Sequence, residues 1–177
     1  DVHTEIELKL QLDGEQAYAT LRTWLDSHGE VREAVQSNRY LDTTGRALAA
    51  RRMMLRVRLA GERVTCTAKA GAEMVGGVMR VQEWEQRLTD PAAATWRAGR
   101  SSSPLRDLPI YEALVAGPLA DLPNAATCVV HVIGVMQTTR RAYRVSSQDL
   151  GLPTGPSITL ELDHSLFPAG QERFELE

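Results

Sequence analysis

The sequence predicts an α+β protein in which about eight antiparallel strands close into a barrel with a charged interior, and helices pack outside it. Three observations lead to this fold. Predicted strands near both ends of the chain alternate charged and apolar residues. Basic strands with the same alternation lie between them, and few segments have helical periodicity.

The first predicted strand, residues 5–10, sets the pattern. Because strand side chains alternate between two faces, Glu5, Glu7 and Lys9 point one way and the apolar residues point the other. The same alternation returns near the far end of the chain in four carboxylates, Glu161, Asp163, Glu175 and Glu177.

Basic residues occupy the same spacing in the middle of the chain. Residues 54–59 carry Arg56 and Arg58, and residues 64–69 end on Lys69. The Gly-Glu pair between these segments indicates an antiparallel hairpin, which brings the three cations to one surface.

Two helical regions are expected to cover the apolar side of the strands. Residues 14–28 repeat apolar side chains at helical spacing, after Asp13 and Gln16 at the spacing of a capping box. Residues 91–115 begin at an Asp-Pro pair typical of a helix start, and a Ser-rich break interrupts them at 101–104.

The remaining elements follow from local composition. Residues 46–52 fit either a short helix or an irregular segment, and residues 71–77 contain three glycines without periodicity, which predicts a mobile loop. The other segments read as strands, at residues 31–42, 78–88, 129–133, 138–145, 157–163 and 173–177.

Length and composition favour one domain over residues 1–177, with 43% hydrophobic and 24% charged residues. A net charge of −3 gives no support for nucleic-acid or membrane binding. Cys66 and Cys128 lack metal-ligand spacing and are expected to be reduced, so we expect a cytoplasmic protein. The chain stops within a predicted strand and is compatible with an excerpt of a longer protein.

A charged barrel interior restricts what the protein can hold. Unpaired buried ions are too costly, so the interior must contain water and compensating ions or ligand. Carboxylates on one wall and Arg or Lys on the other are complementary to a divalent cation that carries a polyanion.

The chain resembles the CYTH superfamily, also called triphosphate tunnel metalloenzymes. Residues 5–9, Glu-Ile-Glu-Leu-Lys, match its ExExK signature, and the later charged segments occur in the family's order. Residues 69–71, 76–78 and 83–84 are similar to bacterial inorganic triphosphatases in particular.

The resemblance implies an eight-stranded tunnel and hydrolysis of a small triphosphate with Mg²⁺ or Mn²⁺. Glu83 is expected to orient water, and Arg140 is preferred over Arg144 as the tunnel-facing arginine. Asp163, Arg144 and Glu85 are expected to be surface or salt-bridge residues. The phosphate-binding and catalytic cations are expected to be Lys9, Arg56, Arg58, Lys69 and Arg140. The metal ligands are expected to be Glu5, Glu7, Glu161, Glu175 and Glu177.

Three functional classes stay open from the sequence. The first is a triphosphate hydrolase, most simply acting on inorganic triphosphate. The second is an adenylyl cyclase that converts ATP to cyclic AMP on the same scaffold. The third is a module that binds polyphosphate or a nucleotide without turnover. The many carboxylates argue against the third class, because phosphate binding without metal gains nothing from them.

Overall fold

The computed structural model describes residues 2–76 and 78–177, except the side chains of residues 2, 6 and 7. Contacts divide the chain into two compact units. Unit 1 comprises Asp1–Glu7 and Ser37–Val135, and unit 2 comprises Leu8–Gln36 and Met136–Glu177. Each unit has an apolar core of its own. The single domain over residues 1–177 stays a prediction.

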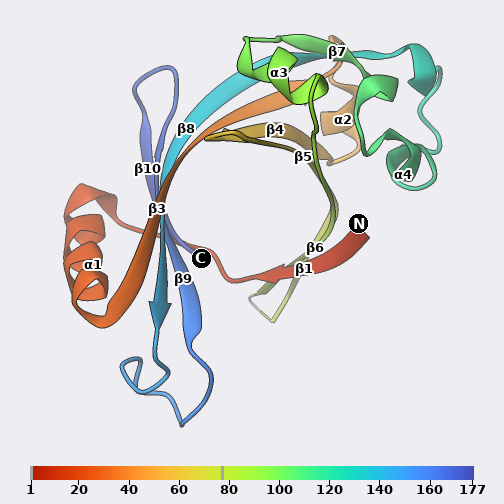
Figure 1. The fold of residues 1–177 in the computed structure, drawn as a ribbon. Helices are drawn as coiled ribbons and strands as arrows, with labels where there is room; N and C mark the ends of the chain where they lie inside the picture. The colour runs from red at the N-terminus through yellow and green to blue at the C-terminus, as the bar shows by residue number, and fades with distance from the viewer. Residues whose placement is uncertain (1, 77) are drawn as a thin grey trace. The chain divides into compact units, whose positions relative to one another are not determined.

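Figure 1 shows the elements along the chain. The strands are β1 (Val2–Glu7), β2 (Leu10–Gln11), β3 (Gly29–Asp42), β4 (Met54–Ala60), β5 (Arg63–Val75), β6 (Val78–Arg87), β7 (Ser102–Pro104), β8 (Val129–Val145), β9 (Ile158–Leu166) and β10 (Glu172–Leu176). The helices are α1 (Gly14–His28), α2 (Ala47–Ala50), α3 (Ala92–Arg97) and α4 (Tyr111–Val115), with short 3₁₀ turns η1 (Leu105–Asp107) and η2 (Ala125–Thr127).

The strands are hydrogen-bonded in the order β1-β6-β5-β4-β3-β8-β9-β10-β2, and β7 pairs with β8. Among the described residues the sheet has ten strands, and its first and last members do not pair with each other. The predicted closed, eight-stranded barrel is therefore wrong in strand number and in closure, whereas the α+β class with antiparallel pairing is confirmed.

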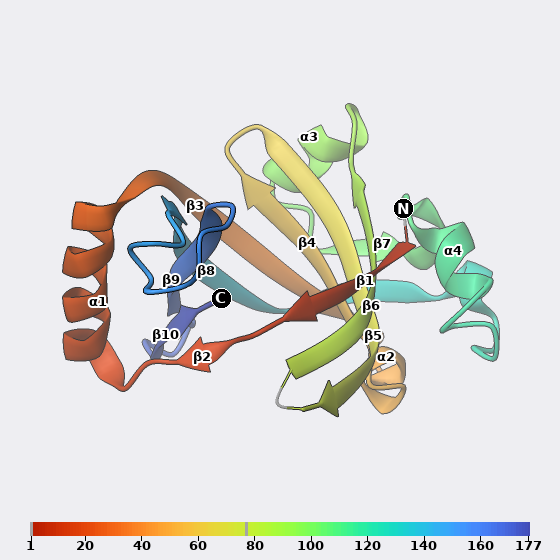
Figure 2. The ribbon, with the colours of Figure 1, turned by 90° about the horizontal axis from the view of Figure 1, so that it is seen from below.

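One cause of the difference in strand number lies in the first predicted strand, residues 5–10. The chain pairs with β6 as far as Glu7, and then pairs with β10 from Leu10 onward. Leu8 and Lys9 belong to neither strand, so the segment predicted as one strand is two (Figure 2).

In unit 1, alternation separates an apolar face from a charged face. Leu55 and Val57 of β4 are buried in the core, where Trp96 of α3 and Leu114 of α4 also lie. The intervening residues of β4 point to the other face. The helices of unit 1 therefore cover the apolar face of its strands, as the alternation predicts.

In unit 2, α1 supplies the cover. Leu25 of this helix packs in one cluster with Tyr143 of β8, Leu162 of β9 and Phe174 of β10. The Tyr143 hydroxyl donates a 2.6 Å hydrogen bond to an Asp26 carboxylate oxygen, which ties α1 to β8. The helix bounds match the prediction, but the side chain at the predicted N-cap forms no capping hydrogen bond.

The loop predicted at residues 71–77 is wrong for the residues described there. β5 runs to Val75 and pairs with β6 through Glu73 and Arg80, with a bulge between Ala70 and Glu73. Glycine supplies the positive φ of 66° at position 71. The glycines that suggested a loop therefore accompany a bulged hairpin, and residue 77 lies outside the described residues.

Two further predictions change in detail. The strands expected at 129–133 and 138–145 are one strand, β8. The helical region expected at 91–115 contains α3, the short strand β7 and α4, because residues 102–104 pair with β8. Within the described chain, no helix combines the length and apolar character needed to cross a membrane.

The two cysteines differ in burial, because Cys66 is buried and Cys128 is half-buried. Neither forms a disulfide. Burial raises the pKa of the Cys66 thiol to about 12, because the charged thiolate is poorly solvated in the core.

We expect iodoacetamide at pH 8 to modify Cys128 in the native protein and to modify Cys66 only in denaturant. Intact mass followed over time measures both reactions, with Cys66→Ala as the control, and equal native rates would contradict the burial of Cys66.

Candidate functional site

The charged face of unit 1 is assembled by strand register. His3 of β1 lies opposite Glu83 of β6, and Glu83 lies opposite Lys69 of β5. Arg56 of β4 lies opposite Thr67, two residues before Lys69. Residues two apart on a strand share a face, so these side chains project from the same side of the sheet.

Lys69 is shared by two carboxylates. Its Nζ donates to an oxygen of Glu5 and lies 3.1 Å from Oε2 of Glu83. Burial raises the pKa of Glu83; the nearby Lys69 opposes this rise and the negative charge of Glu5 adds to it. Nε2 of His3 lies 3.5 Å from the other oxygen of Glu83. Glu83 is thus a buried carboxyl that lies between the Lys69 cation and the His3 ring.

The two arginines of β4 differ in their contacts. Nε of Arg58 donates a 2.8 Å hydrogen bond to Oδ1 of Asn38, which is buried on β3. Arg56 forms no hydrogen bond or ion pair with any residue that the structure describes, and its Nε is buried without a partner. A half-buried cation with no anionic partner among the described side chains is a candidate binding group for an anionic ligand.

The charged face of unit 2 is organised around Arg140 of β8. Its Nε and one terminal nitrogen donate to the two carboxylate oxygens of Asp163 at 2.8 and 2.7 Å. It also contacts Glu177 at 3.0 Å and forms an ion pair with Glu161. Burial by itself would lower the pKa of Arg140, but its hydrogen bonds and these carboxylate charges raise it above its ordinary value.

Carboxylates outnumber cations in the cluster around Arg140, where Glu161, Asp163 and Glu177 accompany Lys9 and Arg140. Nζ of Lys9 lies 2.6 Å from Glu177, so Glu177 joins Lys9 to Arg140. Glu175 lies apart from this contact and is 3.8 Å from Arg173. The cluster therefore carries one negative charge beyond what Lys9 and Arg140 neutralise, which is the condition that attracts an additional cation.

The sequence-predicted residues accordingly fall into two groups. Glu5, Arg56, Arg58, Lys69 and Glu83 share one face of the unit 1 strands. Lys9, Arg140, Glu161 and Glu177 form one connected cluster in unit 2, and Glu175 is outside its ion pairs. The backbone of Glu7 lies in β1, and its side chain lies outside the described residues.

Asp163 was expected to be a surface or salt-bridge residue, and it is a salt-bridge residue. Its side chain is buried and holds Arg140 through two hydrogen bonds, so it positions that arginine, a role that was not predicted. The signal was present in the sequence, because Asp163 shares its face with Glu161. Glu85 accepts a 3.0 Å hydrogen bond from Thr67, and Arg144 bonds Ser157 away from the Arg140 cluster.

The carboxylates of both units are the candidate ligands for a divalent cation. Their oxygen donors fit Mg²⁺ or Mn²⁺, which prefer hard oxygen ligands. Among the described side chains, however, no three His, Cys, Asp or Glu residues are grouped as they would be around an ion. Glu161 and Glu177 instead contact Arg140, so they fit a metal in donor chemistry and would have to exchange contacts to bind it.

Comparison with known proteins identifies the family to which the sequence is similar. A family model described as the CYTH domain matches residues 3–177. No curated protein matches this chain.

Several solved structures share the fold. A candidate adenylyl cyclase from Hippeastrum superimposes with a TM-score of 0.76 at 22% identity, over 97% of this chain and 77% of its own. A candidate adenylate cyclase from Bacillus halodurans gives 0.58 at 22% identity, over 98% and 79%. A Pyrococcus horikoshii protein gives 0.53 at 11% identity, over 98% and 76%. At these identities the likeness shows the fold alone.

The raised pKa of Glu83 leads to a test of its environment. Below the pKa of the unfolded chain, both states hold the proton of Glu83; as pH rises through the higher folded pKa, ionisation of the buried carboxyl reduces stability. Glu83→Gln removes this ionisation. We therefore expect its stability relative to wild type to increase from pH 4 to pH 8, measured by urea unfolding at each pH. A difference that falls with rising pH would contradict the assignment.

Proposed function

Because the chain belongs to the CYTH domain family, we propose that it hydrolyses a triphosphate, and that inorganic triphosphate is its substrate. One observation carries most of this proposal. The guanidinium of Arg56 forms no ion pair or hydrogen bond within the described part of the chain, although its Nε is buried. An anion with several oxygens would satisfy it.

Hydrolysis of a triphosphate requires positioning and charge stabilisation more than covalent chemistry. Charge spreads over the transferred phosphoryl oxygens in the transition state, and fixed cations stabilise it. We assign this role in unit 1 to Arg56, Arg58 and Lys69. Asn38 holds Arg58 in position. Arg58 therefore loses little conformational freedom when it binds phosphate. In unit 2 the assigned cations are Lys9 and Arg140.

Glu83 is assigned to the attacking water. Its buried carboxyl lies within 3.1 Å of Lys69 Nζ and on the same face as Arg56. A carboxyl of raised pKa holds and releases a proton closer to neutral pH than an exposed glutamate does. We propose that it orients water and accepts its proton as the phosphorus–oxygen bond to the leaving diphosphate breaks.

We assign metal binding in each unit to carboxylates because of their hard oxygen donors. The proposed ligands are Glu5 and Glu7 in unit 1 and Glu161, Glu175 and Glu177 in unit 2. A bound Mg²⁺ or Mn²⁺ would neutralise phosphate charge and polarise its oxygens. In the cluster around Arg140 three carboxylates accompany two cations, and this excess of negative charge supports the assignment.

The relatives make hydrolysis the first reaction to test. The Hippeastrum protein is described as a candidate adenylyl cyclase with a dominant triphosphatase activity. The similarity of residues 69–71 and 76–78 to bacterial inorganic triphosphatases supports an inorganic substrate over a nucleotide. ATP nevertheless belongs in the assay, with cyclic AMP as a separate product.

The substrate is tested with a panel of inorganic triphosphate, ATP and thiamine triphosphate, scored for phosphate and cyclic AMP. We expect phosphate release to be fastest from inorganic triphosphate and to be lost with a chelator. Restoration by added Mg²⁺ or Mn²⁺ is the control for damage by the chelator. Undiminished turnover in the chelator would contradict the metal assignment, and cyclic AMP as the main product would replace the hydrolase by a cyclase.

The roles of cations and carboxylates are tested by binding. We expect Arg56→Ala to weaken triphosphate binding about ten- to a hundredfold, because a charge-assisted hydrogen bond contributes about 1.5–3 kcal/mol. Metal binding without substrate is expected to stay unchanged in this variant. Glu161→Ala is expected to weaken metal binding, and calorimetry at matched ionic strength measures both ligands.

The matched control for these variants is Arg106→Ala. This arginine lies on η1 with an exposed side chain, and its ion pair with Asp107 is 3.8 Å long. It changes the net charge by the same amount as Arg56→Ala without touching the charged face. If the variants at Arg56 and Arg106 bind triphosphate equally well, the cations of β4 are not the phosphate site.

A further inference from the structure

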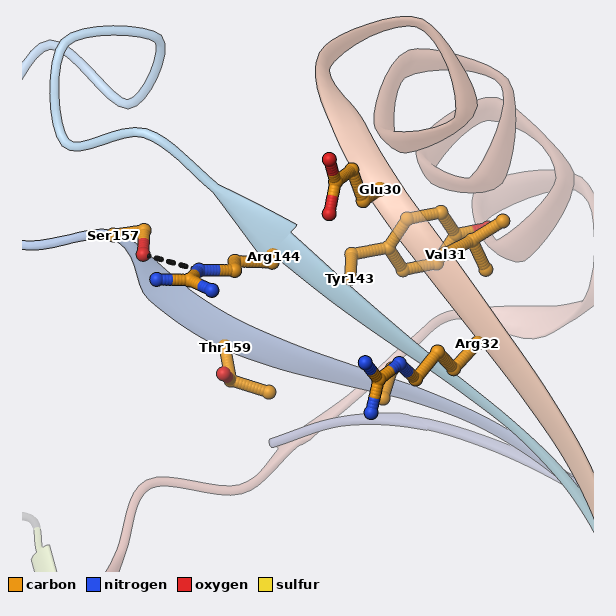
Figure 3. Close-up of a pocket in the computed structure, with 8 residues that line it drawn as sticks. Glu30, Val31, Arg32, Tyr143, Arg144, Ser157 and Thr159 are labelled. Carbon is orange, nitrogen blue, oxygen red and sulfur yellow. Dashed lines mark hydrogen bonds between the residues drawn. The ribbon is translucent and has the colours of Figure 1, made fainter.

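Unit 2 contains a cavity of about 480 Å³ that is separate from the ion-pair cluster of Arg140. Figure 3 shows its side chains, which come from β3, from β8, from β9 and from Ser157 just before β9. The lining residues are Glu30, Val31, Arg32, Ala142, Tyr143, Arg144, Ser157 and Thr159. We call this space the β3–β9 groove.

The groove continues the charged face of unit 2. Arg144 lies four residues after Arg140 on β8, so both project from the same face. Thr159 lies opposite Arg144 and two residues before Glu161, which contacts Arg140. Tyr143 points the other way, since its ring is fully buried and its hydroxyl bonds Asp26 of α1.

The polar groups of the groove favour an anion. Nε of Arg144 donates a 2.7 Å hydrogen bond to Oγ of Ser157, which holds the guanidinium in place while its terminal nitrogens stay available (Figure 3). Arg32 forms no ion pair or hydrogen bond with the residues that the structure describes. Glu30 opposes these two cations with one negative charge, so the groove keeps a positive balance.

The spacing of the arginines selects an extended anion. Four residues of strand separate Arg140 from Arg144 by about 13–14 Å along the backbone. Their guanidinium groups also diverge, since Arg140 bonds Asp163 directly opposite and Arg144 bonds Ser157 toward the other end of the strand pair. One phosphoryl group cannot contact both arginines in these positions.

The groove also continues past Arg144. A second cavity of about 440 Å³ shares Glu30, Arg144 and Ser157 with the first and adds His28, Ser146 and Asp149. Polar groups therefore line both cavities, but the positive balance belongs to the first one, because Glu30 and Asp149 both line the second. The lining of the first cavity offers no accessible aromatic face for a base, because its tyrosine is buried against α1. This composition favours phosphate groups over a nucleoside.

We propose that the β3–β9 groove binds the additional phosphate groups of a linear polyphosphate longer than triphosphate. The inference rests on the proposed function, in which Arg140 contacts the reacting triphosphate end. Arg144 and Arg32 contact phosphates further along the chain, and Thr159 and Ser157 supply hydroxyl donors. The substrate class of the enzyme then includes linear inorganic polyphosphates, and the groove raises affinity for them without changing the site of hydrolysis.

The test compares two probes, inorganic triphosphate and a long-chain linear polyphosphate. Dissociation constants are measured by calorimetry at matched ionic strength with a chelator present, so that hydrolysis does not consume the ligand. We expect Arg144→Ala and Arg32→Ala each to weaken polyphosphate binding about three- to tenfold, since these contacts are charge-assisted but partly exposed. Triphosphate binding is expected to change less than twofold.

A variant that removes a negative charge from the groove is expected to have the opposite effect on polyphosphate binding. Glu30→Gln removes the negative charge that opposes the arginines, so we expect it to tighten polyphosphate binding about two- to fivefold and to leave triphosphate binding unchanged. The matched control is Arg22→Ala on α1, which covers the opposite face of the unit 2 strands. This control removes the same charge from the same unit, and we expect it to alter neither affinity.

The outcomes separate the groove from the proposed function. If wild type hydrolyses triphosphate and the groove variants bind polyphosphate like wild type, the groove proposal is overturned and the hydrolase stands. If the groove variants weaken the binding of triphosphate and of polyphosphate equally, the groove proposal is also overturned, because Arg144 and Arg32 would then act on the triphosphate end. Failure of wild type to bind or hydrolyse triphosphate would overturn the proposed function itself.

Discussion

Both units depend on one constraint, which is that ions on a strand face must be compensated where water is limited. Arg140 meets this constraint through Asp163, Glu161 and Glu177, and Lys69 meets it through Glu5 and Glu83. A buried ion pair of this kind adds little net stability, because desolvation offsets its attraction. The clusters therefore contribute little to folding stability, since apolar residues would stabilise the strands at lower cost.

The apolar side of the same strands supplies the stability. Trp96 and Leu114 cover the unit 1 strands, and Leu25 with its neighbours covers those of unit 2. This division lets the charged faces vary without loss of the core. It also explains why Cys66 is an inert core residue although it is adjacent in sequence to the polar Thr65 and Thr67.

Partner contacts distinguish residues that the sequence makes look equivalent. Arg56 and Arg58 have the same spacing and strand, yet Asn38 holds Arg58 and no described residue holds Arg56. Arg140 and Arg144 share a face, yet one is enclosed by carboxylates and the other bonds a serine hydroxyl. These differences distinguish arginines held by protein contacts on several nitrogens from arginines with unused donors.

The amino-acid sequence by itself determined the α+β class, the bounds of α1, and which side chains of β4, β5 and β9 share a face, because alternation with a period of two is a local property. The tertiary structure decided the rest through contacts between distant residues. It paired residues 73–75 with β6 although their glycine-rich surroundings suggested a loop, and it left the sheet open between β1 and β2. It also placed Asp163 against Arg140. Strand pairing depends on which distant backbone groups can be satisfied, and no single segment carries that information.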